Sequence, residues 1–500
     1  MVNNYGIEAS KRRAKKRQDK LKEQSKQKPK SLNSTKKKNK APNIDWDPMN
    51  NKKIDDVKFD TINWFDASTT KHSDHVVKKI IDEDLQMQLV NMPPGSGKTG
   101  VAVASLGKMQ EKLNESIPFV VISTSKVVSG LGWHRTIRWW NECHPDNQLN
   151  PVLITTVDKF KALCQHNKSK TRLIKSLNKH SILVLDEVHK YKNPTGTRAQ
   201  QLQKLNMFKR LTLTATPLTN NQIDDIMSYL IIGNKYKNKT EFMRISELEK
   251  YKGFRGAYMI FDEDGRVNEF IWPYYNTMLK EWGQFLYRPN IKYEDLNMPD
   301  IDRELIQLKP NKNLFNDMKS LAKAKDNRMF DSPIDYFMEV VERLHIDENR
   351  LNVLLNIIND KNTIQPLIFY QNTVVRDIII DKLESEKINY QVVEGGTNFS
   401  DIDLNSDDPI LIQYQSGSEG IEFKHSNTSI FYQNQWSYST FKQAQGRNRR
   451  RGMKHQVKQY NIVADDPIDE RIYNVVLLRE ELNEEMLNDA VKKAAELYKD

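Results

Sequence analysis

Residues 92–99 read MPPGSGKT, and this stretch decides how the rest of the chain is interpreted. It follows an apolar, strand-like run at Leu85–Met92 and opens an amphipathic stretch at Lys98–Leu113. A strand, a glycine-rich turn and a helix in that order are the context that a phosphate-binding loop requires. Gly95 and Gly97 allow backbone N–H groups to turn toward phosphate oxygens, and the helix N-terminus adds partial positive charge.

This loop predicts a site for ATP with Mg²⁺. Lys98 is expected to reach the β- and γ-phosphates, and the hydroxyl of Thr99 is expected to ligate Mg²⁺. The alternative is a glycine-rich turn before an ordinary helix, which the flanking strand and helix disfavour. The residues expected to hold the nucleotide are Pro94, Gly95, Ser96, Gly97, Lys98, Thr99 and Gly100.

A second signal lies at residues 182–189, which read ILVLDEVH. Four apolar residues predict a buried strand, and the carboxylates of Asp186 and Glu187 emerge at its C-terminal end, where parallel sheets bind ligands. Asp186 is expected to hold Mg²⁺, directly or through water, and Glu187 to orient and deprotonate the attacking water. Such a pair usually starts a solvated loop, but its place about 90 residues after the glycine-rich loop favours a nucleotide site.

Two further segments complete the set. Residues 213–221 read LTATPLTNN after a strand, and small hydroxyl residues there can sense the γ-phosphate. Residues 443–451 read QAQGRNRRR, where Arg447 and Arg450 share one face of a helix. A guanidinium pair can neutralise charge on the transferring phosphoryl group, so both arginines are expected to be catalytic. Taken alone, these segments are a threonine-rich strand edge and a basic helix face.

Composition narrows the class of protein. The chain has 500 residues, enough for two or three domains, and no apolar run approaches the length of a membrane span. Its N-terminus is charged and lacks the apolar part of a secretion signal. The two cysteines, Cys143 and Cys164, could form one disulfide at most and cannot build a metal cluster. We therefore expect a soluble intracellular protein, cytoplasmic or, in a eukaryotic source, nuclear.

The net charge of +11 is unevenly distributed. Residues 1–40 hold 15 Lys or Arg and three acidic residues, whereas the remainder holds 62 bases and 63 acids. Residues 1–45 are also nearly free of large apolar side chains, so we expect a disordered basic tail. This tail is either a phosphate-binding arm, a nuclear import signal or a solvated segment. A nucleic-acid site on the rest of the chain has to be a local patch.

The order of apolar runs predicts the fold class, which is α/β. Strand-like runs alternate with amphipathic stretches in residues 46–232 and again in 341–500, and such alternation predicts parallel sheets flanked by helices. Between these two lobes, residues 233–340 are expected to form a mostly helical insertion that braces the lobes or contacts duplex DNA. A charged helix at Pro467–Lys499 closes the chain. The expected strands are Leu85–Met92, Phe119–Thr124, Val152–Thr156, Ile182–Leu185, Arg210–Thr214, Gln365–Tyr370, Tyr390–Val393, Ile410–Tyr414 and Ser429–Tyr432.

Together, the phosphate loop, the DExH box, the TAT segment and the QxxGRxxR segment resemble the motor of helicase superfamily two. The details are most similar to the Swi/Snf-type DNA translocases. Residues 118–145 (PFVVISTSKVVSGLGWHRTIRWWNECHP) resemble motif Ia with its Trp-containing helix, and residues 186–194 (DEVHKYKNP) resemble the DEAH box. Further similar segments are Leu153–Thr156 (motif Ib), Ile226–Leu230 (the helix after the TAT segment), Pro366–Tyr370 (motif IV), residues 417–423 (GSEGIEF, motif V) and Trp436 before motif VI.

The resemblance spans about residues 85–475 and implies two RecA-like lobes. ATP would be held by the first lobe and capped by Arg447 and Arg450 of the second. The chain departs from the family pattern where Ala215 replaces a glycine, where motif VI lacks its Ile-Gly-Gln ending, and where no adenine-contacting glutamine precedes Met92. The residues implied to couple nucleotide state to movement are His189, Thr214, Thr216 and Gln443.

The resemblance also implies a nucleic-acid path across both lobes. Backbone amides and hydroxyls suit this role because they grip phosphates without reading bases. The implied contacts are Ser123, Thr124, Lys126, Thr155 and Thr156 in the first lobe and Gly417, Ser418 and Gly420 in the second. The expected function is an ATP-dependent translocase or helicase on DNA, with duplex favoured over single strands. The alternatives are an RNA helicase of the same superfamily and a nucleic-acid-binding switch that is not a motor.

Overall fold

The computed structural model describes residues 54–56, 70–83, 85–191, 202, 207, 209–219, 223–251, 259–262, 265–289, 298–309, 333–395, 397, 401–414, 422–449, 453 and 455–495. Several predictions therefore fall outside the described residues. They concern the basic tail 1–45, the catalytic Arg450 and the side chain of Lys126, together with the motif V residues Gly417, Ser418 and Gly420.

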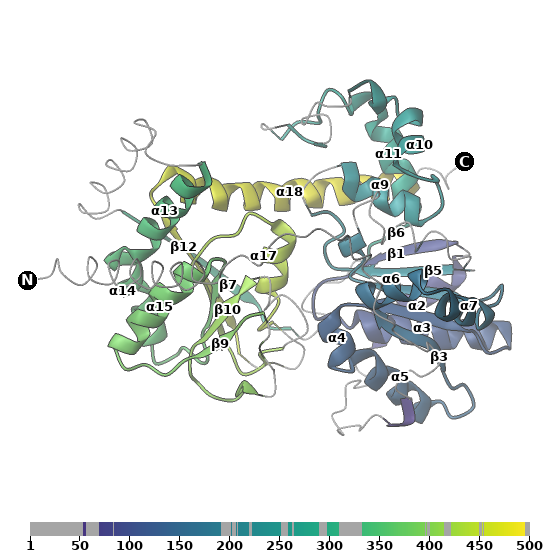
Figure 1. The fold of residues 1–500 in the computed structure, drawn as a ribbon, viewed down its shortest axis with the longest axis horizontal. Helices are drawn as coiled ribbons and strands as arrows, with labels where there is room; N and C mark the ends of the chain where they lie inside the picture. Colours follow the sequence, from purple (N-terminus) through teal and green to yellow (C-terminus); the bar gives the residue numbers. More distant parts are fainter. Residues whose placement is uncertain are drawn as a thin grey trace, which may run out of the picture. The chain divides into compact units, whose positions relative to one another are not determined.

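The first lobe is built on a sheet of six parallel strands in the order β3-β2-β4-β5-β1-β6 (Figure 1). Parallel strands need crossover connections, which the intervening helices supply. The strands are β1 (Met87–Asn91), β2 (Phe119–Ser123), β3 (Pro151–Thr156), β4 (Ile182–Asp186), β5 (Lys209–Thr214) and β6 (Leu286–Tyr287). The helices are η1 (Ile54–Asp56), α2 (Thr70–Asp82), α3 (Lys98–Leu113), α4 (Ser125–Ser129), α5 (Gly132–Cys143), α6 (Val157–Gln165), α7 (Asn167–Lys175), η3 (Val188–Tyr191) and α9 (Ile223–Ile232).

Both faces of this sheet are buried. Along β2, Val120 and Ile122 join a hydrophobic cluster with residues of α9, whereas Phe119 and Val121 join a second cluster with residues of α2, α3 and α5. Side chains alternate between the two faces of a strand, so a strand of consecutive apolar residues has to be covered on both sides. The predicted two-sided α/β arrangement of this lobe is confirmed.

The second lobe repeats this design with six parallel strands in the order β7-β12-β11-β8-β10-β9. Within β8, Ile368 and Tyr370 face a cluster that includes α14 and α15 residues, and Leu367 and Phe369 face a cluster that includes α17. The strands are β7 (Ile301–Leu308), β8 (Leu367–Tyr370), β9 (Gln391–Val393), β10 (Ile410–Gln413), β11 (Thr428–Phe431) and β12 (Val457–Ala464). The helices are α13 (Pro333–Ile346), α14 (Glu348–Ile358), α15 (Thr373–Ser385), α17 (Tyr438–Gln445) and α18 (Pro467–Ala495).

All nine predicted strands form, with ends that shift by one or two residues. Three strands, β6, β7 and β12, were not predicted. β7 lies at the edge of its sheet and leaves most of its residues at least partly exposed, so it has no apolar run. In β12 the buried side chains include Gln459 and Asn461, which interrupt the apolar pattern.

Helices cover fewer than half of the described residues of segment 233–340, so the predicted mostly helical insertion is not confirmed. The helices there are α10 (Lys239–Ile245), η4 (Leu248–Tyr251), α11 (Trp272–Gly283) and the start of α13. The segment also contributes β6, which pairs with β1, and β7, which pairs with β12. Part of this segment therefore completes the two sheets, while the domain boundaries themselves stay a prediction.

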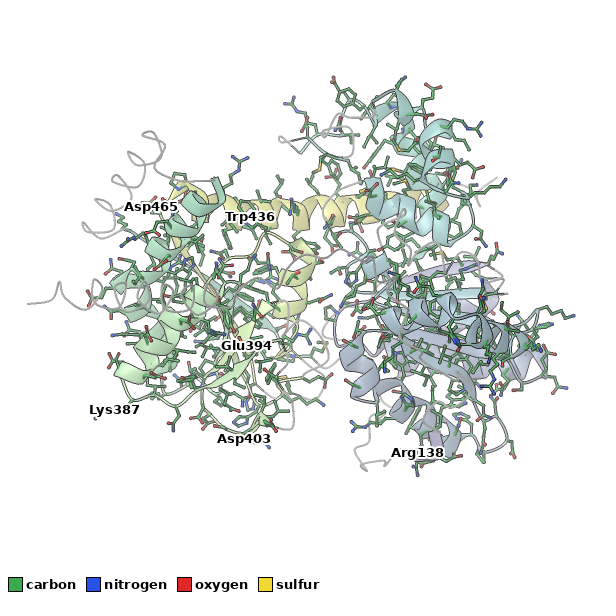
Figure 2. All side chains as sticks on the ribbon, in the orientation of Figure 1. Arg138, Lys387, Glu394, Asp403, Trp436 and Asp465 are labelled. Atoms are coloured by element: carbon green, nitrogen blue, oxygen red, sulfur yellow. The ribbon has the colours of Figure 1, made fainter. Side chains whose placement is uncertain are left out.

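Helix α18 is the predicted closing helix, and it contacts α11, α17 and β12. Glu480 pairs with Lys442 of α17, and Glu484 pairs with Arg288 beyond β6. Arg479 donates to the carbonyl oxygen of Trp436 at 2.6 Å. Trp436 is labelled in Figure 2. These contacts attach α18 to the first lobe, through Arg288 beyond β6, and to the second lobe, through Lys442 of α17.

Within the described part of the chain, no helix combines the length and the apolar character needed to cross a membrane. Both cysteines are free thiols, with Cys143 exposed and Cys164 buried. The structure therefore relies on packing and hydrogen bonds, not on a disulfide between these two residues.

Candidate nucleotide-binding site

The glycine-rich loop connects the C-terminal end of β1 to the first residue of α3. Gly95 has a φ of 76° and Gly97 a φ of 88°, and these left-handed conformations are ones that side chains disfavour. Ser96 closes the turn, because its hydroxyl donates to the carbonyl oxygen of Pro93 at 2.7 Å. The loop therefore has the backbone shape that the sequence predicted, with Lys98 at the helix start.

The ammonium group of Lys98 lies over this loop. Its Nζ is 3.3 Å from the carbonyl oxygen of Met92 and 3.2 Å from that of Pro93. Thr99 and Gly100 follow in the first turn of α3, where backbone N–H groups lack partners within the helix. A cation and N–H donors at one helix start form an environment suited to phosphate.

Two carboxylates lie at the end of a central strand of the same sheet. Asp186 is the last residue of β4, which runs between β2 and β5, and it is 7% exposed. Glu187 follows with a φ of 50°, a left-handed conformation that costs energy for a residue with a side chain. Strain of this kind is retained where the surrounding structure enforces it, and it turns Glu187 away from the strand direction.

Asp186 is held by two donors from the region of motif Ia. The hydroxyl of Ser123, at the end of β2, donates to Oδ2 of Asp186 at 2.8 Å, and the indole N–H of Trp133, on α5, donates to the same oxygen at 3.1 Å. Oδ1 accepts no hydrogen bond from the described residues. One oxygen of this carboxylate is therefore committed to the protein, and the other remains for a ligand.

The two carboxylates differ in their electrostatics. Burial, and then the charge of Glu187, raise the pKa of Asp186, whereas the hydrogen bonds from Ser123 and Trp133 oppose that increase. Burial also disfavours the ionised form of Glu187, but the close contact with His189, together with nearby lysines, outweighs burial and lowers the pKa of Glu187. A cation bound at Asp186 would stabilise its ionised form.

The four predicted coupling residues lie in one chain of contacts. Nδ1 of His189 is 3.0 Å from the hydroxyl oxygen of Thr214 and 3.3 Å from Oε2 of Glu187. The backbone N–H of Thr216 donates to the same Thr214 hydroxyl at 3.0 Å. From the second lobe, Nε2 of Gln443 lies 3.3 Å from Nε2 of His189. His189 therefore contacts a carboxylate of the site with one ring nitrogen and the second lobe with the other.

Motif VI approaches the phosphate loop through its glycine. A Cβ placed on Gly446 would lie 2.9 Å from Cβ of Pro94, closer than real Cβ atoms come to a neighbour. Arg447 follows directly and is buried, and its carbonyl oxygen accepts from the N–H of Phe423 at 3.2 Å. The structure thus places the start of motif VI against the loop, while the catalytic role of Arg447 stays a prediction.

Of the predicted nucleic-acid contacts whose side chains the structure describes, most are buried. Ser123 is fully buried and bonded to Asp186, and Thr155 is also buried, with its hydroxyl 3.4 Å from the carbonyl oxygen of Thr156. Thr156 is half-buried and caps α6 by accepting from the N–H of Lys159. Thr124 is buried at the start of α4, and its hydroxyl has no partner among the described residues. Neither Ser123 nor Thr155 presents its hydroxyl at the surface here.

Sequence reasoning did not assign Ser123 and Trp133 to the nucleotide site. Ser123 is 63 residues from Asp186 and Trp133 is 53 residues away, so no local spacing connects them. A buried Trp with an apolar helix face also resembles ordinary core. The usable signal was chemical, because a buried indole N–H needs an acceptor.

The site fits Mg²⁺ as a companion of the nucleotide. No group of three or more His, Cys, Asp or Glu side chains that could hold a metal ion alone occurs in the described ranges. Mg²⁺ is commonly bound by one or two protein oxygens together with phosphates and water. The open Oδ1 of Asp186 and the hydroxyl of Thr99, at the start of α3, have the chemistry that this arrangement needs.

Comparisons with known proteins agree with this geometry. Residues 92–247 match the SNF2-related domain, and residues 349–452 match the helicase conserved C-terminal domain. The first match begins at the phosphate loop, and the second covers most of the strands of the second sheet together with motif VI.

Curated proteins and a solved structure are similar over most of the chain. Chromodomain-helicase-DNA-binding protein 6 of Rattus norvegicus is 21% identical over 469 residues, which cover 80% of this chain and 17% of that protein. The Mycoplasma genitalium protein named "Uncharacterized ATP-dependent helicase MG018" is 23% identical over 333 residues, 63% of this chain and 31% of that protein. The Sulfolobus solfataricus SWI2/SNF2 ATPase core in complex with dsDNA is 15% identical with a TM-score of 0.35, over 85% of this chain and 96% of that chain.

The chain spans less than a third of the length of either of these two curated relatives. The two family matches together span just over half of the chain. The chain therefore belongs to the SNF2-related helicases of superfamily two.

Proposed function

We propose that this protein hydrolyses ATP with Mg²⁺ and uses the energy to move along or remodel duplex DNA. The observation that carries the proposal is the contact chain at the end of β4. There Glu187 lies 3.3 Å from His189, and His189 lies 3.3 Å from Gln443 of the second lobe. A water-orienting carboxylate linked to the other lobe is what a motor needs, because the chemical state must alter the lobe contacts.

Binding of ATP is assigned to the loop of residues 94–100. The turn formed by Gly95 and Gly97 directs N–H groups toward the phosphates, and Lys98 exchanges its bonds to loop carbonyls for bonds to phosphate oxygens. Thr99 and Asp186 would hold Mg²⁺, which supplies neutralising charge to the phosphates. The second lobe contributes Arg447 and Arg450, whose guanidinium groups would neutralise the negative charge that builds on the transferring phosphoryl group.

Glu187 is assigned the attacking water. Its pKa is held low by His189 and nearby lysines, so its carboxylate is ionised at neutral pH and accepts hydrogen bonds from water. A carboxylate with a low pKa is a weak base, and its main contribution is therefore to orient the water and to accept the proton late. The backbone at this residue is held in a left-handed conformation, with a φ of 50°.

Coupling is assigned to the contacts of His189. Loss of the γ-phosphate changes what Glu187 and Thr214 bind, and His189 contacts both of them as well as Gln443. A change at the nucleotide therefore alters a contact between the lobes. Repeated closing and opening would move nucleic acid by alternate gripping of its phosphates.

Support for DNA as the polymer comes from the relatives, since the printed name of one includes DNA binding. The test is ATP turnover without polymer, with duplex DNA, with single-stranded DNA and with RNA. The blank is Lys98→Ala, and the matched control is Lys108→Ala, because Lys108 is an exposed lysine of the same helix that pairs with Glu111.

Duplex DNA is expected to raise turnover of the wild type and of the Lys108 variant, and not that of the Lys98 variant. If RNA or single-stranded DNA raised turnover more than duplex DNA did, the part of the proposal that names duplex DNA would be contradicted. Turnover at the level of the Lys98 variant on every polymer would leave only a nucleotide-dependent switch.

A further inference from the structure

The two donors on Asp186 form an arrangement that the family motifs do not account for. Ser123 ends β2 and Trp133 is the second residue of α5, and both side chains are 0% exposed. Their donor atoms lie 2.8 Å and 3.1 Å from one and the same oxygen, Oδ2 of Asp186. In the sequence, Ser123 was predicted to touch nucleic acid and Trp133 was part of a helix.

The two hydrogen bonds to a single oxygen fix the plane of the Asp186 carboxylate. The terminal torsion of an aspartate is broad, so a free carboxylate can exchange its two oxygens. Two donors that converge on Oδ2 remove that freedom and leave Oδ1 as the oxygen available to a ligand. Metal ligands are commonly oriented in this way by hydrogen-bond donors or acceptors behind them.

We propose that Ser123 and Trp133 are positioning residues that orient Asp186 for the metal ion that accompanies the nucleotide. The inference rests on the proposed function, because it concerns the same site. It deepens that function by assigning a metal-orienting role to two side chains of the motif Ia region. Neither residue touches the substrate, and both act through Asp186.

A purely structural role for Trp133 predicts a different outcome. Trp133 packs in the hydrophobic cluster between the sheet and α3, so its ring also stabilises the lobe. Trp133→Phe keeps an aromatic ring and removes the N–H donor, and Ser123→Ala removes one hydroxyl. If the N–H only satisfied a buried carboxylate, these changes would lower stability and leave Mg²⁺ dependence unchanged.

The experiment is calorimetric titration of ADP into the full chain, in EDTA and at a series of Mg²⁺ concentrations. ADP affinity in EDTA is expected to stay within about twofold of the wild type for both variants. The Mg²⁺ concentration that half-saturates the tighter complex is expected to rise about 10- to 100-fold, as for other residues that orient metal ligands. Turnover should fall with it and recover in part at high Mg²⁺, with the KM for ATP little changed at saturating metal.

The chain offers matched controls. Trp140 lies on the same helix, is buried, and donates its indole N–H to the carbonyl oxygen of Asn147 at 3.0 Å. Ser228 is a buried serine on α9 whose hydroxyl donates to the carbonyl oxygen of Asp224 at 2.7 Å. Trp140→Phe and Ser228→Ala therefore lose the same donors away from Asp186, and melting temperatures are recorded for all four variants.

Wild-type Mg²⁺ dependence in both Trp133→Phe and Ser123→Ala would overturn this inference alone. If Trp133→Phe fails to fold, Ser123→Ala decides, because it removes a single oxygen. A wild type that binds ADP with or without Mg²⁺ no better than Lys98→Ala would overturn the proposed function, and this inference with it. A raised Mg²⁺ requirement in the two variants and not in the two controls supports it.

Discussion

Each lobe buries a group of charged side chains beside its sheet, and the two groups are satisfied differently. In the second lobe, Arg350 is 0% exposed and pairs with Asp469, which is 2% exposed. Arg350 also donates to the carbonyl oxygens of Tyr432 at 2.9 Å and Ile462 at 3.3 Å. Oδ2 of Asp469 accepts from the N–H of Ala464, and Oδ1 accepts from an amide hydrogen of another side chain, Asn434.

In the first lobe, two carboxylates stand side by side without such complete pairing. Asp186 has both of its donors on one oxygen, and Glu187 lies next to it in a strained backbone conformation. Lys98 bonds to loop carbonyls, and His189 contacts Glu187. This group is therefore suited to receive further positive charge with a ligand.

The comparison teaches that burial and residue type do not separate structural charges from functional ones. Both Asp469 and Asp186 are buried carboxylates close to the end of a strand. They differ in whether the protein occupies both oxygens. A buried carboxylate that the fold satisfies completely holds the fold together, while one with an open oxygen at the edge of a parallel sheet indicates a binding site.

The largest expected effect comes from removing one charge of the carboxylate pair in the first lobe. Glu187→Gln keeps the size of the side chain and removes its charge, so polymer-stimulated turnover is expected to fall about 10²- to 10⁴-fold. Stability should change little, because Glu187 still exposes a quarter of its side chain. Turnover and melting temperature are measured together, and a turnover within about twofold of the wild type would remove Glu187 from the water-orienting role.

The same change from carboxylate to amide in the second lobe should lower stability and leave turnover nearly unchanged. Asp469→Asn leaves Arg350 buried without its counter-charge, and breaking one partner of such a pair costs about 3–5 kcal/mol. Urea denaturation is expected to show this loss, while turnover per folded molecule stays close to the wild type at low temperature. A normal unfolding midpoint together with lost turnover would mean that the two groups have been assigned the wrong way round.

A smaller effect is expected on the pH dependence of stability, from a histidine next to the buried ion pair of the second lobe. Burial, and then the charge of Arg350, lower the pKa of His345 to about 3 from an ordinary 6.5, and its Nδ1 is 2.7 Å from the carbonyl oxygen of Val341. Below pH 6.5 the unfolded chain binds a proton that the folded chain excludes. Stability should therefore fall by up to about 1.4 kcal/mol per pH unit between pH 6 and pH 3.

His345→Asn can still donate to Val341 and does not titrate, so it should flatten this part of the stability profile. The measurement is the urea midpoint at pH 7, 6, 5 and 4 for the wild type, His345→Asn and the exposed-site control His75→Asn. A profile for His345→Asn as steep as that of the control would contradict a neutral buried histidine.

Most of the fold was predictable because its signals are local. The apolar runs of β1 and β4 are short and continuous, and the glycine pattern of residues 92–99 fixes the loop between a strand and a helix. The edge strand β7 was not predictable from apolar pattern, since its side chains are largely exposed. Its place in the sheet depends on pairing with β12, which lies far along the chain.

The site was predictable only as far as the motifs reach. Asp186, Glu187 and Lys98 were predicted from their place after strands, and the structure gathers them with His189 and Gln443. The Oδ2 partners Ser123 and Trp133 were not assigned to this site, because their spacing from Asp186 is set by the strand order β2-β4. Contacts made across a sheet leave no periodic trace in one sequence.

Gly446 makes the substitutions that are possible in the second lobe depend on the residue present in the phosphate loop. Its φ of −87° suits any residue, so the backbone does not require glycine there. Space does, because an added methyl group would meet Pro94 at 2.9 Å. A change at 446 can be accommodated only if residue 94 or the distance between the two segments changes with it. Positions 94 and 446 therefore constrain each other as one unit, although they belong to different motifs.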